Sequence, residues 1–180
     1  ICTLGFFSNL KALLASGPDR WSKLSGKDLV AKKVKLLVSM AGAFPNGYEF
    51  NVYLDADAAR TVADEWPTPI IFSGWEIGSE IFTGNAVRDL PGDISANPIK
   101  AAYTLALSED DRPHGRDSWD QTAALVAIRG AAPWFTLRHG HMKVDGKGNN
   151  KWTDDPQGQH AYLVFAQPIK QVRDAIEALM

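Results

Sequence analysis

Two polar side chains near the middle of the chain have types and spacing suited to binding a sugar. Glu49 and Asn51 stand two residues apart, so an extended backbone would point both to one side and Phe50 to the other. A carboxylate accepts hydrogen bonds and an amide both accepts and donates them, so the pair could share two neighbouring hydroxyls. The alternative is that residues 45–47 form an ordinary turn and that Glu49 is solvated.

Asp120 is the second candidate, because the sequence pattern places it in the first turn of a helix. The helix dipole and the free N–H groups there favour an ionised carboxylate, which suits a hard cation and equally suits helix stabilisation. The aromatic ring of neighbouring Trp119 could stack on a planar ring. His114, in a loop dense in charge, could donate a proton to a leaving group.

Other chemistry has weaker support in the sequence. His139 and His141 are two apart on a predicted strand and could bind a metal, but no third ligand follows them, and both could simply face solvent. Gly146-Lys147-Gly148 lies between predicted strands and lacks the helix start that would bind a phosphate. No Gly-x-Ser-x-Gly sequence is present.

The candidate residues require an α/β scaffold. Residues 34–40 form a near-continuous apolar run, as expected of a strand buried on both faces. A helix capped by Asp55 and a strand over residues 68–73 follow, which is the βαβ order of a parallel sheet. Because ligands bind beyond the carboxyl ends of such strands, we expect the loop at 44–51 to be functional. We predict an open, mostly parallel sheet with helices on both faces, plus a small β-hairpin appendage near residues 134–165.

The composition indicates a single globular domain. The chain has 180 residues, 45% of them hydrophobic and 22% charged, with a formal net charge of −2. We therefore expect neither nucleic acid nor a membrane as partner. Cys2 is the single cysteine, so an internal disulfide is excluded. The chain opens in an apolar, strand-like stretch at Ile1 without a recognisable leader, so we expect a preceding segment. Cytoplasm and periplasm both stay open as compartments.

Several segments carry a family resemblance. They occur in the same order across most of residues 1–130, and they are residues 4–10 (LGFFSNL), 37–42 (LVSMAG), 49–51 (EFN) ahead of 55–59 (DADAA), and 119–123 (WDQTA). In these segments the chain resembles the carboxyl-terminal part of the inosine/uridine-preferring nucleoside hydrolases. The resemblance implies hydrolysis of the N-glycosidic bond of ribonucleosides with a bound Ca²⁺.

The resemblance also implies roles for individual residues. Asp120 and the backbone carbonyl of Leu4 would bind the ion, and Glu49 and Asn51 would hydrogen-bond the ribose. The sugar pocket would further include Met40 and, as the best candidate for an expected asparagine, Asn46. The partner would be a nucleoside or another ribose-containing small molecule, and a homo-oligomer is possible.

The sequence departs from the family pattern at Trp119, in the altered glycine-rich turn after Met40 and, most of all, at its amino-terminal end. Trp119 stands where many members have a histidine, so that residue cannot protonate the departing base. The amino-terminal Asp-x-Asp-x-x-x-Asp-Asp cluster, which supplies most of the Ca²⁺ ligands, has no counterpart in these residues. We expect the natural protein to contain that half. One alternative is a non-catalytic nucleoside- or sugar-binding module, and another is a structural domain that dimerises around the hairpin and Trp152.

Overall fold

The fold is built on a mixed seven-stranded sheet. A computed structural model describes residues 1–107 and 114–180, and within them the strand order is β1-β2-β4-β9-β7-β8-β3. The strands are β1 (Cys2–Thr3), β2 (Leu37–Met40), β3 (Asn46–Tyr48), β4 (Ile70–Ser73), β7 (Phe135–Val144), β8 (Asn149–Asp154) and β9 (His160–Phe165). A separate two-stranded sheet pairs β5 (Phe82–Thr83) with β6 (Arg116–Asp117).

The main sheet has a parallel part and an antiparallel part that meet at β9. β1, β2, β4 and β9 pair in parallel, whereas β9, β7, β8 and β3 pair antiparallel. Five strands, these four and β8, therefore run in one direction, and the predicted mostly parallel sheet is confirmed. The antiparallel strands expected near residues 134–165 are present, and β9 joins them to the main sheet. β3 was not predicted, because its partner β8 lies about a hundred residues away.

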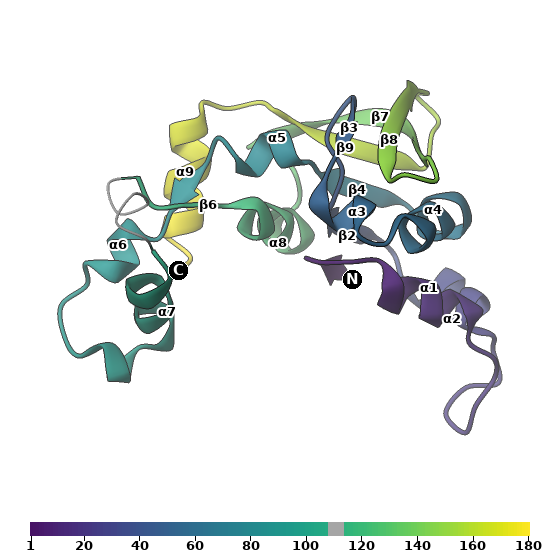
Figure 1. Cartoon of the computed structure of the whole chain (residues 1–180), viewed down its shortest axis with the longest axis horizontal. Coiled ribbons are helices and arrows are strands. Elements are labelled where there is room, and N and C mark those ends of the chain that lie inside the picture. Colours follow the sequence, from purple (N-terminus) through teal and green to yellow (C-terminus); the bar gives the residue numbers. More distant parts are fainter. Residues whose placement is uncertain (108–113) are drawn as a thin grey trace.

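Helices cover both faces of the sheet, as predicted (Figure 1). One face packs against helices α1, α2 and α4, and the other against α5, α8 and α9. The helices are α1 (Ser8–Ala15), α2 (Gly26–Lys33), α3 (Phe50–Tyr53), α4 (Ala56–Glu65), α5 (Trp75–Gly78), α6 (Asn85–Arg88), α7 (Pro98–Ala106), α8 (Trp119–Arg129) and α9 (Ile169–Glu177). A 3₁₀ turn, η1 (Ile94–Ala96), precedes α7.

The apolar run that predicted β2 is explained by burial on both faces. Leu37 belongs to the core under α1, α2 and α4, whereas Val38 belongs to the core under α5, α8 and α9. All four β2 residues are buried, because successive side chains of a strand point to opposite faces. Full burial of a side chain such as Leu37 contributes about 1.5–3 kcal/mol.

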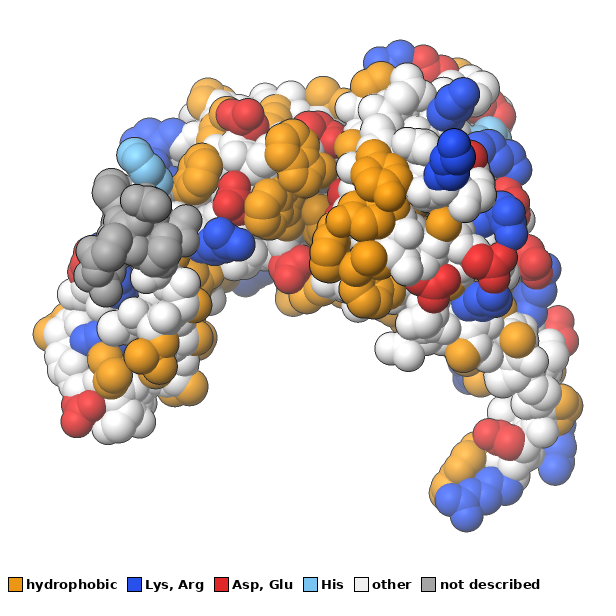
Figure 2. All heavy atoms as spheres, in the orientation of Figure 1, with side chains coloured by type: hydrophobic (Ala, Val, Ile, Leu, Met, Phe, Trp, Pro, Cys, Tyr) orange, Lys and Arg blue, Asp and Glu red, His pale blue; other side chains and the backbone are white. Residues whose placement is uncertain are grey.

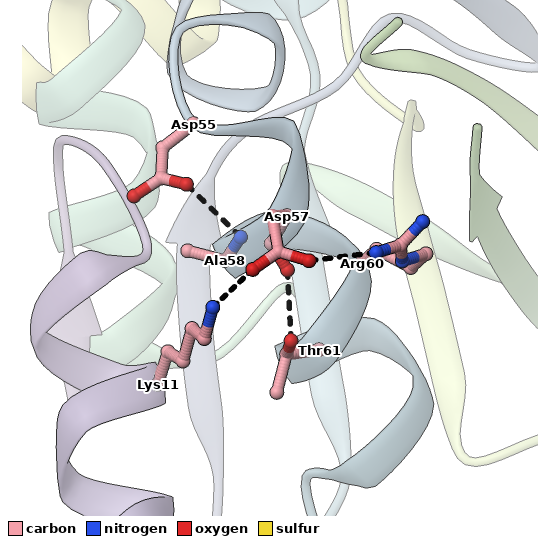
Figure 3. A network of polar contacts seen from close by, with 6 residues as sticks. All are labelled: Lys11, Asp55, Asp57, Ala58, Arg60 and Thr61. Atoms are coloured by element: carbon pink, nitrogen blue, oxygen red, sulfur yellow. Dashed lines mark hydrogen bonds and ion pairs between the residues drawn. The ribbon is translucent and has the colours of Figure 1, made fainter. Parts of the chain in front are cut away.

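The start of α4 shows how local sequence fixes an element (Figure 3). Asp55 caps this helix by accepting the backbone N–H of Ala58 at 3.0 Å, as predicted. Asp57 in the first turn pairs with Arg60 at 2.6 Å and with Lys11 of α1. The cap therefore sets where α4 begins, and the ion pair links α4 to α1.

The molecule has the shape of an arch (Figure 1). α6 and α7 project at one end, and the connection between α1 and α2 projects at the other. No helix in residues 1–107 or 114–180 has the length and apolar character needed to cross a membrane.

Candidate functional site

A cavity of about 350 Å³ opens at the carboxyl ends of the parallel strands. Leu4 follows β1, Met40 ends β2, and Trp75 comes shortly after β4. These three strands are neighbours in the sheet, and the edge they share is where open α/β sheets bind ligands. The lining residues are Leu4, Met40, Glu49, Phe50, Asn51, Trp75, Trp119 and Asp120.

Six of the residues proposed from the sequence thus line one cavity. Four of them lie in the first third of the chain, namely Leu4, Met40, Glu49 and Asn51. The other two, Trp119 and Asp120, lie in the first turn of α8. The arrangement places carboxylate, amide and aromatic side chains around a single space. Phe50 and Trp75 also line the cavity and were not proposed as site residues.

Glu49 and Asn51 converge, but not through the extended backbone that the sequence suggested. Asn51 lies in α3, and Glu49 is the N-cap of this short helix, accepting the Asn51 backbone N–H on Oε1 at 2.9 Å. The helical turn also brings Phe50 to the cavity wall rather than away from it. The extended prediction was wrong because a local cap closes the turn, and glutamate is an uncommon residue at that position.

The Glu49 carboxylate is held firmly in the cavity wall. It is 4% exposed, and its Oε2 accepts the backbone N–H of Gly42 at 3.0 Å. Burial raises the pKa of Glu49; hydrogen bonds from the N–H groups of Asn51 and Gly42 oppose the rise, and the charge of Asp120 adds to it. A carboxylate oxygen has two lone pairs, so Glu49 keeps acceptor capacity for a ligand in the cavity that it lines.

Asn51 is fixed to the end of β2. Its side-chain N–H donates to the backbone carbonyl of Met40 at 3.0 Å and lies 3.2 Å from the Met40 sulfur. Within the described residues nothing donates to Asn51 Oδ1. The amide therefore has an acceptor to offer a hydroxyl in the cavity.

Asp120 occupies the first turn of α8, as predicted. Asp120 is exposed at the cavity, and the partial desolvation of its carboxyl there raises its pKa. A neighbouring cation would favour the charged form and oppose this rise.

The two indoles of the cavity are connected through backbone contacts. Trp119 donates its ring N–H to the backbone carbonyl of Trp75 at 3.0 Å. Gly78 makes this approach possible, since a Cβ there would lie 2.4 Å from the Trp119 Cα. Hydrophobic side chains gather on this face over α5 and over α3 and β3 (Figure 2), where Trp75 and Phe50 are about half exposed.

Glu76 is a partly buried carboxyl next to the cavity residue Trp75 in sequence, and it was not singled out from the sequence. Its Oε2 accepts the backbone N–H of Phe44 at 3.0 Å. Its Oε1 is buried without a partner among the described residues. Burial raises the pKa of Glu76, and the charge of Glu49 adds to the rise. Gly74 leaves room for this carboxyl, since a Cβ there would lie 2.3 Å from Oε1.

Two proposed residues lie away from the cavity wall. Asn46 is in β3, opposite Lys151, and its Oδ1 accepts the backbone N–H of Trp152 at 3.3 Å. His114 is exposed in a turn, with its ring near that of Phe82. The surrounding charged loop, residues 108–113, lies outside the described residues.

The described residues do not by themselves form a Ca²⁺ site. No group of three histidine, cysteine, aspartate or glutamate side chains that could hold a metal occurs in residues 1–107 and 114–180. Asp120 and the Leu4 carbonyl offer oxygens of the right kind at the cavity, but Ca²⁺ binds about 6–8 oxygens. Further ligands would have to come from outside these residues.

The fold is similar to that of solved nucleoside hydrolases. An inosine-uridine preferring nucleoside hydrolase from Bacillus anthracis superposes with a TM-score of 0.63 at 14% sequence identity, covering 99% of this chain and 58% of that one. A plant nucleoside hydrolase superposes with a TM-score of 0.67 at 19% identity, covering 98% of this chain and 60% of that one. The chain therefore shares their α/β fold over less than two thirds of their length.

Sequence comparison adds nothing to this likeness. No protein-family model matches the chain, and no curated protein matches it. At identities below 20% the structural likeness establishes the fold, and what the cavity does is a separate question.

Proposed function

We propose that this chain is part of an enzyme that hydrolyses the N-glycosidic bond of ribonucleosides to ribose and free base. The observation that carries the proposal is the convergence of Glu49, Asn51 and Asp120 on one cavity at the carboxyl ends of parallel strands. The shared fold with solved nucleoside hydrolases supports it.

The cavity wall offers complementary groups to a ribose. Glu49 can accept hydrogen bonds from hydroxyls through its remaining lone pairs. Asn51 Oδ1 lies next to it and can accept from another hydroxyl. Both groups are fixed by hydrogen bonds to the backbone, so little side-chain entropy would be lost on binding.

The same carboxylates suit the transition state of this reaction. As the bond from C1′ to the base nitrogen breaks, the base leaves with the electron pair, and positive charge builds up on the ribosyl group. A water oxygen then bonds to C1′, and the proton that the water loses is balanced by protonation of the base. Glu49 and Asp120 would stabilise the cationic sugar more than the neutral substrate.

The aromatic side chains suit the other half of a nucleoside. Trp119 borders the cavity beside Asp120, and an indole can stack on a planar base. The group that protonates the departing base stays unassigned, because His114 lies away from the cavity wall.

Ca²⁺ remains the proposed cofactor, with Asp120 and the Leu4 carbonyl as two of its ligands and the others from outside the described residues. The test is Ca²⁺ calorimetry on the full-length protein. Asp120→Asn should weaken Ca²⁺ binding, while Asp174→Asn, a surface change on α9, should not. Unchanged affinity in Asp120→Asn would remove this residue from the proposed site.

A non-catalytic nucleoside- or sugar-binding module is the second candidate. Its basis is the cavity lined by Glu49 and Asn51, which could bind a ribose without breaking a bond. Purified full-length protein with Ca²⁺ should release reducing sugar from at least one purine or pyrimidine nucleoside. Ribose binding by calorimetry without release from any nucleoside would refute the enzyme and favour the binding module.

A further inference from the structure

The loop after β2, residues 41–44, is held by groups from several distant elements. The backbone N–H of Ala41 donates to Ser73 in β4 at 3.2 Å. The backbone N–H groups of Gly42 and Phe44 donate to Glu49 and Glu76, each at 3.0 Å. This loop therefore sets the position of one of the two hydrogen bonds that orient the Glu49 carboxylate.

Ala43, at the centre of this loop, is held by Asn150 of β8. The Ala43 N–H donates to Asn150 Oδ1 at 2.9 Å, and Asn150 Nδ2 donates to the Ala43 carbonyl at 2.8 Å. Asn150 is 1% exposed. Both backbone groups of Ala43 are therefore satisfied by one side chain whose own position is fixed by burial, and losing that side chain would leave them without these partners.

Gly42 transmits this constraint to the cavity. It adopts a left-handed backbone conformation with φ of +82°, which a glycine adopts without steric cost. Its N–H points to Glu49, and its carbonyl accepts the backbone N–H of Trp75 at 2.8 Å. A shift of Ala43 would therefore move two groups of Gly42 at once. These are the N–H that donates to Glu49 and the carbonyl that accepts from Trp75, which lines the cavity.

We infer that Asn150 is a positioning residue for the cavity, acting on Glu49 through Ala43 and Gly42. The inference rests on the proposed function for its catalytic consequence. Asn150 does not line the cavity, and it lies 107 residues from Ala43 in sequence. The antiparallel part of the sheet thereby takes part in shaping a site that is otherwise built on the parallel part.

The test compares Asn150→Ala with Asn149→Ala, a matched change in the same strand. Asn149 bonds to Asp145 in the adjoining turn, so its loss disturbs the hairpin without touching Ala43. The reporter is hydrogen exchange of the Gly42 amide, whose acceptor is Glu49 and not Asn150. Exchange there should accelerate about tenfold or more in Asn150→Ala and stay unchanged in Asn149→Ala.

Steady-state kinetics supply the second readout. In Asn150→Ala, kcat per folded molecule should fall about tenfold with KM changed less than threefold, because a misplaced Glu49 stabilises the transition state poorly. Asn150→Asp keeps the size of the side chain and the oxygen that accepts the Ala43 N–H. It replaces the NH₂ group that donates to the Ala43 carbonyl. This variant should show the same direction of change if Asn150→Ala does not fold.

The outcomes separate the two proposals. Unchanged exchange at Gly42 in both Asn150 variants would overturn the positioning role, whatever the activity. A wild-type protein that cleaves no nucleoside would refute the proposed function, while exchange at Gly42 would still decide the role of Asn150.

Discussion

The side-chain amide of Asn51 donates to the backbone carbonyl of Met40 across 3.0 Å. This bond joins the first turn of α3 to the end of β2, which are two walls of the same cavity. The residue that we propose as a ligand for ribose is thus also a structural link, so its substitution should affect both stability and binding.

We predict that Asn51→Ala lowers the free energy of unfolding by about 1–3 kcal/mol, because the buried Met40 carbonyl loses its donor. Ribose affinity measured by calorimetry should fall with it. Asn46→Ala is the control, since Asn46 is exposed on β3 away from the cavity, and it should change stability by less than about 0.5 kcal/mol. If urea unfolding gave equal losses in the free energy of unfolding for Asn51→Ala and Asn46→Ala, the structural role of the bond between Asn51 and Met40 would be contradicted.

Glu49→Gln should reduce kcat by about 100-fold or more while changing KM little, since a carboxylate stabilises the cationic transition state more than the neutral substrate. Both Glu49 oxygens accept backbone N–H groups, so the new amide NH₂ also faces a donor. The folded fraction must therefore be measured by circular dichroism alongside the kinetics. A raised KM at unchanged kcat would mean that Glu49 stabilises the bound substrate and the transition state equally.

Gly78→Ala should destabilise the protein by about 1–3 kcal/mol, because the added methyl group meets the Trp119 backbone and ring. The tryptophan fluorescence of the folded state should shift as well, since Trp119 must move. Gly146→Ala serves as the control because a Cβ there meets nothing within 4 Å. A fully stable Gly78→Ala protein would show that the contact between α5 and α8 can relax.

His160 should make stability depend on pH. Burial, aided by the positive charges of His141 and Lys143 and opposed by Asp64, lowers the pKa of His160 to about 4. The unfolded imidazole takes up a proton near pH 6.5. Between these values the unfolded state binds more protons, so the free energy of unfolding decreases as the pH falls from about 6.5 to about 4, by up to about 3 kcal/mol.

Urea unfolding at pH 7 and pH 4.5 measures this effect. The neutral state of His160 agrees with its Nδ1 accepting the Met142 backbone N–H at 3.1 Å. His160→Gln should lose less stability between the two pH values than the wild type, whereas His139→Gln, on the exposed side of β7, should behave like the wild type. Identical pH dependence in all three proteins would exclude His160 as the source.

The parts of the fold that follow from neighbouring residues could be predicted from the sequence. The apolar run of β2 and the Asp55 cap of α4 each carry a local signal that the structure confirms. The same holds for the start of α8 with Asp120 in its first turn. Local patterns therefore singled out Glu49, Asn51, Trp119 and Asp120 of the cavity lining, whereas Leu4 and Met40 were named only through the family resemblance.

Features that depend on distant partners could not be predicted. β3 forms only because β8 pairs with it, and a Pro-Asn-Gly sequence is by itself a turn signal. Asn150 carries no local mark of its contact with Ala43. The position of His114 also depended on tertiary structure, and its residue type alone gave no information about its distance from the cavity.

The sequence separation of 107 between Ala43 and Asn150 has a consequence for the order of assembly. We expect contacts between positions so far apart to form late, because closing the long loop between them costs chain entropy before the contact adds any stability. On a ribosome the β2 segment would emerge long before the strand that secures the loop behind it. The pocket would acquire its final shape only once β8 had been made, because termination before β8 would leave the loop at residues 41–44 without its two hydrogen bonds to Asn150.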